Sequence, residues 1–194
     1  MGLNGYKTKN KIIDATLDII ASEGVQNVTI RKIAAIAAVN VAAVNYHFGS
    51  KDVVITDALK TITSRLMEAF ACLKNQDMDP VSRIRLFINQ YSRVVSEYPD
   101  IINYFITRSF NHEIIPGGYQ DYLKEEGIEL IRRTLLEIKP DEEAVLSMRA
   151  VQILSALSFP IMLGNHIKEA IGLDLLDPEV RQSYNDLLFK NSLK

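Results

Sequence analysis

Cysteine and long hydrophobic runs are both scarce in this chain of 194 residues. The one cysteine, Cys72, cannot form an internal disulfide, which is typical of a reducing compartment. No uninterrupted apolar stretch approaches the roughly 20 residues that span a bilayer. Residues 1–11 are polar and basic with no apolar core, so they do not form a secretory signal peptide. These absences predict a cytoplasmic protein without a membrane partner.

Histidine is scarce as well, and its spacing does not suit a metal. His112 and Glu113 begin like a zinc-protease motif, but the second histidine is missing. Neither His47 nor His166 has a partner at metal-binding helical spacing. Gly49-Ser50-Lys51 lacks the upstream glycine of a phosphate-binding loop. The sequence therefore predicts no metal, no cofactor and no enzyme, and a helical enzyme stays a weakly supported alternative.

The charges are unevenly distributed along the chain. Apolar residues make up 47% and charged residues 24%, which is ordinary for a globular protein, and the net charge is −2. Residues 1–51 carry six basic and three acidic side chains, whereas the remainder carries sixteen basic and twenty-one acidic ones. A basic segment on an acidic body is expected where only one end meets phosphate, although so small an excess also arises by chance.

The apolar residues recur at helical spacing, and no segment alternates like a half-buried strand. Asp79-Pro80 and Asp177-Pro178 each resemble an N-cap followed by proline at the first helical residue. Pro160 should kink the helix that contains it. The sequence thus predicts an all-α fold of nine helices. After a first helix that ends at Gly24, they cover about 29–37, 40–46, from 51, 81–97, 100–112, 119–138, 141–168 and 178–190.

Residues 28–51 carry most of the functional information. Ala37-Ala38-Val39 forms a turn between two short helices, and Asn40 can cap the second of them. A short, tightly turned helix pair after a longer amphipathic helix is the helix-turn-helix arrangement, whose second helix can enter the major groove of DNA. By composition alone, however, such a segment is more often a buried helix pair. The side chains expected on its inner side are Val28, Ile33, Ala34, Ile36, Val39 and Val44.

The other side chains of this segment suit contact with duplex DNA. Phosphate contacts set register, and base contacts set sequence preference. A structural role for His47 is the alternative to a phosphate contact. The predicted DNA-binding residues are Thr29, Tyr46, His47 and Lys51 toward phosphate, Arg31, Val41, Ala42, Ala43 and Asn45 toward bases, and the capping Asn40.

The same segment resembles the DNA-binding domain of the TetR family. That family has a T-x-x-x-I-A stretch, then A-G-V-S, then Y-x-H/Y-F-x-x-K. Residues 29–34, 37–40 and 45–51 fill these positions. Ala38 replaces the turn glycine, and Asn45 stands where a tyrosine is frequent. The resemblance implies a DNA-binding domain at 1–50, an effector-binding and dimerisation domain at 51–194, and double-stranded operator DNA as partner.

The resemblance also implies a homodimer in which the last two helices form a four-helix bundle. The sequence is compatible with this, because both helices are more apolar than one intramolecular face requires. A wholly intramolecular core is the alternative. The side chains concerned are Val145, Met148, Val151, Ile153, Leu154, Leu157, Ile161 and Met162, with Leu187, Leu188 and Phe189 from the final helix.

A small-molecule pocket is expected between the helices of the second domain. Aromatic walls with a few polar groups describe such a site, and they equally describe an ordinary core. A buried Arg108 would need an anionic or polar partner, which suggests an apolar or aromatic effector, possibly with an acidic group. The predicted effector-binding residues are Met67, Phe70, Phe87, Tyr91, Tyr104, Phe105, Arg108, Gln152 and Phe159, with Ser155 beside them.

The implied mechanism is a shift between two dimer conformations. A ligand would move the fourth helix, which is joined to the DNA-binding segment at Lys51, and so change the separation of the two recognition helices. A repressor is the default, although an activator would use the same parts. The competing hypothesis is a helical interaction or scaffold protein without DNA binding. It predicts that Lys51→Glu has no effect on the binding partner.

Overall fold

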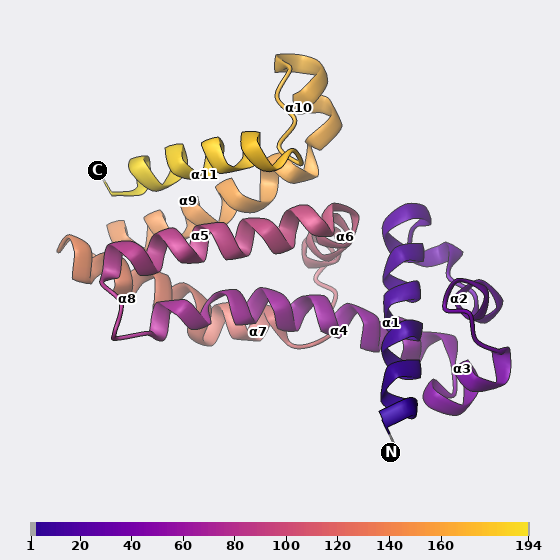
Figure 1. Ribbon diagram of the computed structural model, residues 1–194. Coiled ribbons are helices and arrows are strands. Elements are labelled where there is room, and N and C mark those ends of the chain that lie inside the picture. Colours follow the sequence, from indigo (N-terminus) through magenta and orange to yellow (C-terminus); the bar gives the residue numbers. More distant parts are fainter. Residues whose placement is uncertain (1–2, 194) are drawn as a thin grey trace.

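The computed structural model describes residues 3–193, and those residues form helices and turns without a strand (Figure 1). The all-α prediction is confirmed. In chain order the α-helices are α1 (Leu3–Glu23), α2 (Ile30–Ile36), α3 (Val41–Phe48), α4 (Lys51–Ala69), α5 (Pro80–Glu97), α6 (Pro99–Phe110), α7 (Tyr119–Tyr122), α8 (Ile128–Ile138), α9 (Glu143–Met162), α10 (Gly164–Ile171) and α11 (Pro178–Ser192).

Helices α1, α2 and α3 lie together at one end of the molecule, and we call them the head (Figure 1). The apolar stripe of α1 is buried against α2 and α4, with Ile12 and Ile20 at 2% exposure or less. Ile33 from α2 and Val44 from α3 complete this small core. Since the three helices share one apolar interior, their outer sides are left free for a partner.

Helix α5 lies in the middle of the second group of helices, where it contacts α4, α8, α9 and α11 (Figure 1). Asp79 caps it by accepting a hydrogen bond from Ser82 N at 3.0 Å, and Pro80 follows as expected. Helix α4 begins at the Ser50 cap and runs from the head into this body. Any displacement of α4 in the body therefore reaches the head through a continuous helix.

Two expected helices are divided in the structure, so the expectation of nine was too low. The segment 119–138 comprises α7, a π-helical turn at Leu123–Gly127 and α8. The segment 141–168 breaks at Leu163 into α9 and α10, and α10 projects away from the body (Figure 1). Pro160 lies in the last turn of α9 and has no N–H to donate to the carbonyl oxygen of Ala156, which instead accepts from the Tyr184 hydroxyl at 2.8 Å, and α9 ends two residues later at Met162.

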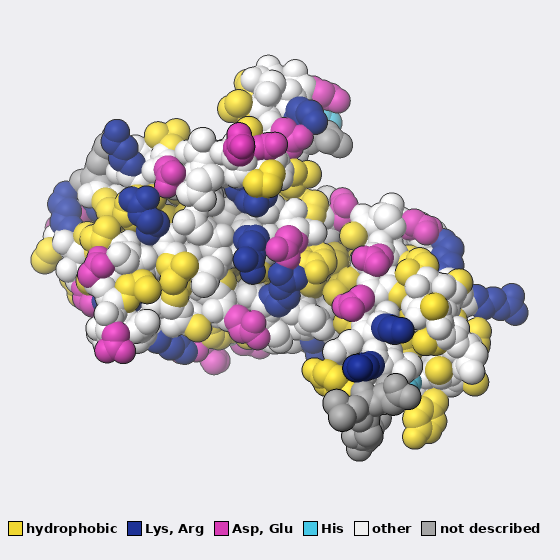
Figure 2. Space-filling model, in the orientation of Figure 1, with side chains coloured by type: hydrophobic (Ala, Val, Ile, Leu, Met, Phe, Trp, Pro, Cys, Tyr) yellow, Lys and Arg dark blue, Asp and Glu magenta, His cyan; other side chains and the backbone are white. Residues whose placement is uncertain are grey.

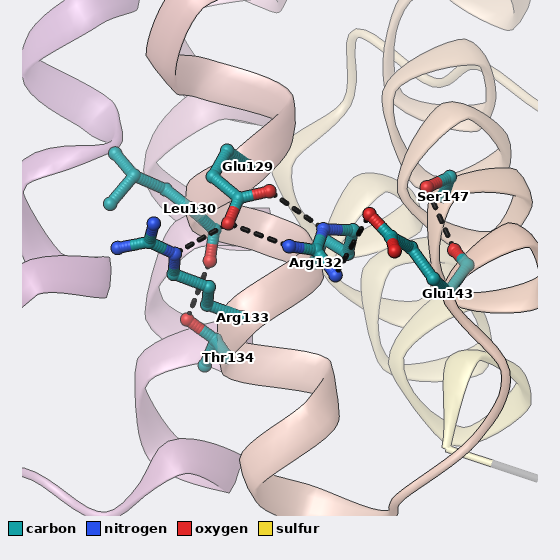
Figure 3. A network of polar contacts seen from close by, with 7 residues as sticks. All are labelled: Glu129, Leu130, Arg132, Arg133, Thr134, Glu143 and Ser147. Carbon is teal, nitrogen blue, oxygen red and sulfur yellow. Dashed lines mark hydrogen bonds and ion pairs between the residues drawn. The ribbon is translucent and has the colours of Figure 1, made fainter.

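Two charged networks join helices of the body. Arg83 is 2% exposed and donates to the carbonyl oxygen of Leu73 at 2.9 Å, while its guanidinium pairs with Glu137. Figure 3 shows the second network, in which Glu129 accepts from both Arg132 and Arg133 of α8. Arg132 also reaches Glu143 at the start of α9, 3.6 Å away. These contacts fix α8 against α5 and α9.

Helix α9 is unusually apolar for a helix with so much exposed surface. A 19-residue window, Glu143–Ile161, has a mean hydropathy of 1.5, which by length and composition alone is enough to cross a membrane, yet only 28% of it is buried. Core helices of soluble proteins pass the same test, and α9 packs on α5, α6 and α8. The uncovered part of this helix is an apolar surface that needs a partner.

Candidate DNA-binding surface and effector cavity

Local caps define both short helices of the head. The Thr29 side chain accepts from Lys32 N at 3.2 Å at the start of α2, and the Asn40 side chain accepts from Ala43 N at 2.6 Å at the start of α3. Each cap satisfies an N–H group that the first helical turn leaves unpaired. The predicted pair of short helices and its capping residues are thus present.

The turn between α2 and α3 is strained at one residue. Ala38 has a φ of +52°, in the left-handed region that costs an L-residue with a Cβ roughly 1–2 kcal/mol. Its neighbours hold it there, because Val39 N donates to the carbonyl oxygen of Ala34 at 2.9 Å. The turn therefore accepts the strain of a positive φ at a residue other than glycine.

Helix α3 presents small and polar side chains to solvent. Tyr46 is 82% exposed and Val41 42% exposed, whereas Val44 and Phe48 are buried against the head. One expected inner residue is wrong: Ile36, the last residue of α2, is 53% exposed. Of the predicted DNA-binding residues, Ala43 and His47 are half-buried, and the exposed ones are Thr29, Arg31, Asn40, Val41, Ala42, Asn45, Tyr46 and Lys51.

Basic side chains of the head differ in their partners. Lys32 pairs with Glu23 at 2.5 Å, so its charge is compensated within the head. Arg31 and Lys51 are exposed and take part in none of the ion pairs found among residues 3–193. Figure 2 shows basic side chains standing out from the head at the right of the view. Free cations beside an exposed helix suit an anionic partner.

His47 lies between the exposed surface and the core of the head. Its Nδ1 atom is buried and has no hydrogen-bond partner among the described residues. Its ring meets Tyr46 edge-on, with the centroids 5.3 Å apart, and also contacts Phe48. The His47 ring thus packs against the exposed Tyr46. This contact is compatible with a structural role for His47 and also with a phosphate contact.

The head is joined to the body by α1 as well as by α4. Lys9 of α1 forms an ion pair with Asp57 of α4 at 3.5 Å and also lies over the Phe48 ring, 5.4 Å from its centroid. Helix α1 packs on α6 too. A movement of α4 or α6 is therefore transmitted to the head through direct contacts.

A cavity of about 530 Å³ opens between α5, α6, α7 and α9, with Leu66 from α4 at its wall. Four residues expected around an effector line it: Tyr91, Phe105, Ser155 and Phe159. The remaining lining residues are Leu66, Ile102, Ile106, Ser109, Phe110, Ile115, Tyr119, Gln120, Leu123, Leu154 and Ser158. Residues 119–123 were expected within a helix, but their place in the cavity wall, and that of Ile115 in the preceding loop, depends on packing that no local pattern indicates.

The other expected effector residues lie outside the cavity lining. Phe70 and Phe87 are fully buried in an aromatic cluster, with centroids 4.7 Å apart. Met67, Tyr104 and Gln152 are not among the lining residues either. These side chains were chosen for their types, and burial in the core explains the two phenylalanines without a ligand.

Arg108 is not the buried cation that was expected. Its side chain is 32% exposed and is already paired with Glu113 at 3.0 Å. It also donates to the Tyr104 hydroxyl at 2.8 Å. The buried arginine of this chain is Arg83, which the sequence analysis did not single out and which lies against Glu137, away from the cavity.

Two phenols meet at the wall of the cavity. The hydroxyl oxygens of Tyr91 on α5 and Tyr119 on α7 are 2.6 Å apart. Burial raises the pKa of both phenols, since the charged form would lose its hydration. Both side chains therefore remain neutral hydrogen-bonding groups at neutral pH.

The loop before α7 packs very closely on α4. Gly117 has a φ of +93°, and a Cβ atom built on it would lie 2.0 Å from Thr63 Oγ1. Its neighbours in the chain, Ile115 and Tyr119, line the cavity. The cavity wall and the helix that leads to the head thus touch at a position where only glycine fits.

Both candidate dimer helices expose large apolar side chains. Met148 and Val151 of α9 are 64% and 51% exposed, Phe159 is 57% exposed, and Leu187 of α11 is 58% exposed. Other expected members, Ile153, Leu157, Ile161 and Phe189, are buried in the chain's own core. The side chain of Met162, also expected here, lies outside the described residues. Helix α9 therefore has one face inside and an apolar face outside, whereas α11 exposes Leu187 on an otherwise mostly polar outer face.

A helix-turn-helix head on an all-helical body is an arrangement in which the exposed second helix of the pair can enter the major groove of DNA. Residues 12–57 match the family described as bacterial regulatory proteins, tetR family. The predicted resemblance is confirmed: the N-terminal domain is that of the TetR family, and the chain has the fold of its regulators. A comparison with curated proteins gives no match.

Solved structures of regulators share the fold at low sequence identity. A TetR-like transcriptional regulator from Rhodococcus sp. RHA1 aligns with a TM-score of 0.66 at 17% identity, over 95% of this chain and 93% of that one. A TetR regulator from Legionella pneumophila gives 0.67 at 16%, over 94% and 96%. The fatty acid degradation regulator FadR from Bacillus halodurans gives 0.64 at 18%, over 94% of each chain.

Proposed function

We propose that this chain is a cytoplasmic, ligand-responsive transcriptional regulator that binds a palindromic operator as a homodimer. The observation that carries the proposal is the capped, exposed α3, with Tyr46 82% exposed at its end and the unpaired Lys51 just beyond it. Backbone phosphates would be held by Thr29, Tyr46 and Lys51. Bases would meet Arg31 and the small residues of α3, so DNA shape contributes strongly to sequence preference.

The homodimer is supported by the apolar face of α9 and by the exposed Leu187 of α11. Side chains such as Met148, Val151 and Leu187 expose too much apolar surface for a free monomer face. Two copies of the helix pair can bury these faces against each other in a four-helix bundle. The dimer would place two copies of α3 on the same side of one duplex, which a two-fold symmetric operator requires.

The response to a ligand is supported by the contacts around the cavity. A molecule between α6, α7 and α9 would displace the segment 115–119, which lies against Thr63 of α4. Helix α4 and helix α1 then carry the displacement to the head. Releasing most of a bound population takes about 5 kcal/mol of differential ligand affinity for the two conformations. A repressor that leaves its operator when the ligand binds is the default form of this regulation.

The decisive experiment is selection of duplexes from a random library by the purified chain, followed by sequencing. The expected result is an inverted repeat whose affinity falls with rising salt. Lys51→Glu should reduce the affinity at least about tenfold without unfolding the chain, because a phosphate contact becomes a repulsion. Lys124→Glu is the matched control, since this exposed lysine lies in the body.

The opposite outcome is equally clear. A purified chain that selects no common sequence, or whose duplex affinity is the same in Lys51→Glu as in Lys124→Glu, contradicts the DNA-binding proposal. It would favour a helical interaction protein that uses the exposed apolar side chains of α9 and α11 for another partner.

A further inference from the structure

We propose that the cavity binds an uncharged, largely apolar molecule with one oxygen atom that accepts a hydrogen bond from the Tyr91–Tyr119 pair. This inference rests on the function proposed above, because it takes the cavity as the effector site and names the class of ligand. It also replaces the expectation of an acidic group, which depended on a buried Arg108.

The walls of the cavity determine the apolar character of the ligand. They come from α4, α5, α6, α7 and α9, and most of the lining side chains are aliphatic or aromatic, for example Leu66, Ile102, Phe105 and Leu154. A volume of about 530 Å³ lies within the range of small-molecule sites, which is roughly 300–1,000 Å³. A ligand of this size gains most of its affinity by leaving water for such walls.

The charge of the ligand follows from what the lining contains. None of the side chains around the cavity, all within the described part of the chain, is acidic or basic. Arg108, on the same helix as Phe105, is bound to Glu113 at 3.0 Å and is not in the lining. A carboxylate or ammonium group moved into the cavity would lose its hydration without gaining an opposite charge.

The two phenols supply the polar contact. Their oxygens are 2.6 Å apart, so one proton is used in the bond between them. The second phenol proton remains to be donated to an oxygen in the cavity, and Ser155 and Ser158 offer further hydroxyls in the lining. The raised pKa values keep both phenols protonated, so they act as donors. An alcohol, ketone, ester or ether oxygen suits this position.

The test is a titration of the full chain, without DNA, with decan-1-ol and with decanoate at pH 7.5. These probes share an apolar tail and differ in the charge of the head group. We expect decan-1-ol to bind at least about tenfold more tightly than decanoate. The double variant Tyr91→Phe with Tyr119→Phe removes both phenol protons, so it should weaken decan-1-ol binding about fivefold, the effect of one neutral hydrogen bond, and leave decanoate nearly unchanged.

Tyr122→Phe is the matched control. Its ring packs edge-on against Phe70, 5.4 Å between centroids, and its phenol is not part of the lining. The same substitution there should leave the affinity for decan-1-ol within about twofold. Decanoate binding as tightly as decan-1-ol, binding of neither probe, or an unchanged affinity in the double variant that lacks both phenol hydroxyls would each overturn the inference.

A second readout separates this inference from the proposed function. Release of the selected duplex is measured with the same probes. Decan-1-ol that binds in the titration but does not release the duplex counts against the ligand response and leaves the class of ligand standing. A failed titration together with normal duplex binding counts against the ligand class alone.

Discussion

The head and the body of this molecule owe their structures to different kinds of contact. In the head, side-chain caps at Thr29, Asn40 and Ser50 define where helices begin, and each bonds a backbone N–H three residues away. In the body, the main contacts join residues far apart, such as Arg83 with Glu137 and Tyr91 with Tyr119. The head is thus specified locally, whereas the cavity exists only once the body has assembled.

The largest expected effect concerns the body, whose exposed apolar face on α9 is proposed to be buried only in the homodimer. Val151→Asp places a charge in the exposed apolar face of α9, and we expect it to weaken the homodimer at least about thirtyfold, because hot-spot side chains of an interface carry 2 kcal/mol or more. Light scattering coupled to gel filtration measures the change. Val81→Asp, at a valine of α5 that is 39% exposed, is the control. If the wild-type chain is a monomer, or if both substitutions weaken the dimer equally, the exposed apolar face of α9 is not the dimer interface.

The second largest effect is expected where the loop before α7 packs on α4, the helix that leads to the head. Gly117→Ala would bring a Cβ atom to 2.0 Å from Thr63 Oγ1 at a φ of +93°, so we expect a loss of about 2–3 kcal/mol in the free energy of unfolding. Denaturant unfolding measures it.

The double variant with Thr63→Ala is the matched test of this contact. It should recover part of the loss, because the nearest atom is removed while the backbone strain at residue 117 remains. Purely additive effects of the two substitutions would show that the close approach of the loop to α4 is not what makes glycine necessary.

Within the head the expected effect is smaller and of opposite sign. Ala38→Gly relieves the strain of a φ of +52°, so we expect a gain of about 1 kcal/mol in thermal or denaturant unfolding of the head. Ala35→Gly, in the regular part of α2, should instead cost about 1 kcal/mol. If both glycines destabilise, the turn does not hold residue 38 in the left-handed region in solution.

The sequence predicted the head more fully than the body for the same physical reason. Capping residues and turn spacing are local patterns, so the turn after α2 and the Asn40 cap of α3 were predicted correctly. The cavity depends on segments that meet only after folding, so a helix from residue 119 could be predicted but not that Tyr119 and Gln120 would line a cavity together with Ile115. The split at Leu163 was missed because a proline in a periodic segment predicts either a kink or an end.

The smallest effect is expected for Glu129 and the two arginines beside it on α8. These contacts join neighbours in the sequence although they lie in the body, so local contacts are not confined to the head. Hydrogen bonds from Arg132, and then from Arg133, lower the pKa of Glu129 from 4.5 to about 2 (Figure 3). Because the folded-state pKa is depressed, this stabilisation is fully present above about pH 4.5 and is lost as the pH falls toward 2. Glu129 is a third exposed, so the loss should stay below about 1 kcal/mol.

Glu129→Gln should therefore flatten the decline of unfolding free energy between pH 4.5 and 2 and change little at pH 7 beyond the loss of the ion pair. Urea unfolding at several pH values measures the slope. Glu125→Gln, at an exposed glutamate outside the network, is the control. Equal slopes in the two variants would mean that solvent screens the network completely, and that α8 is held against α9 by its apolar face alone.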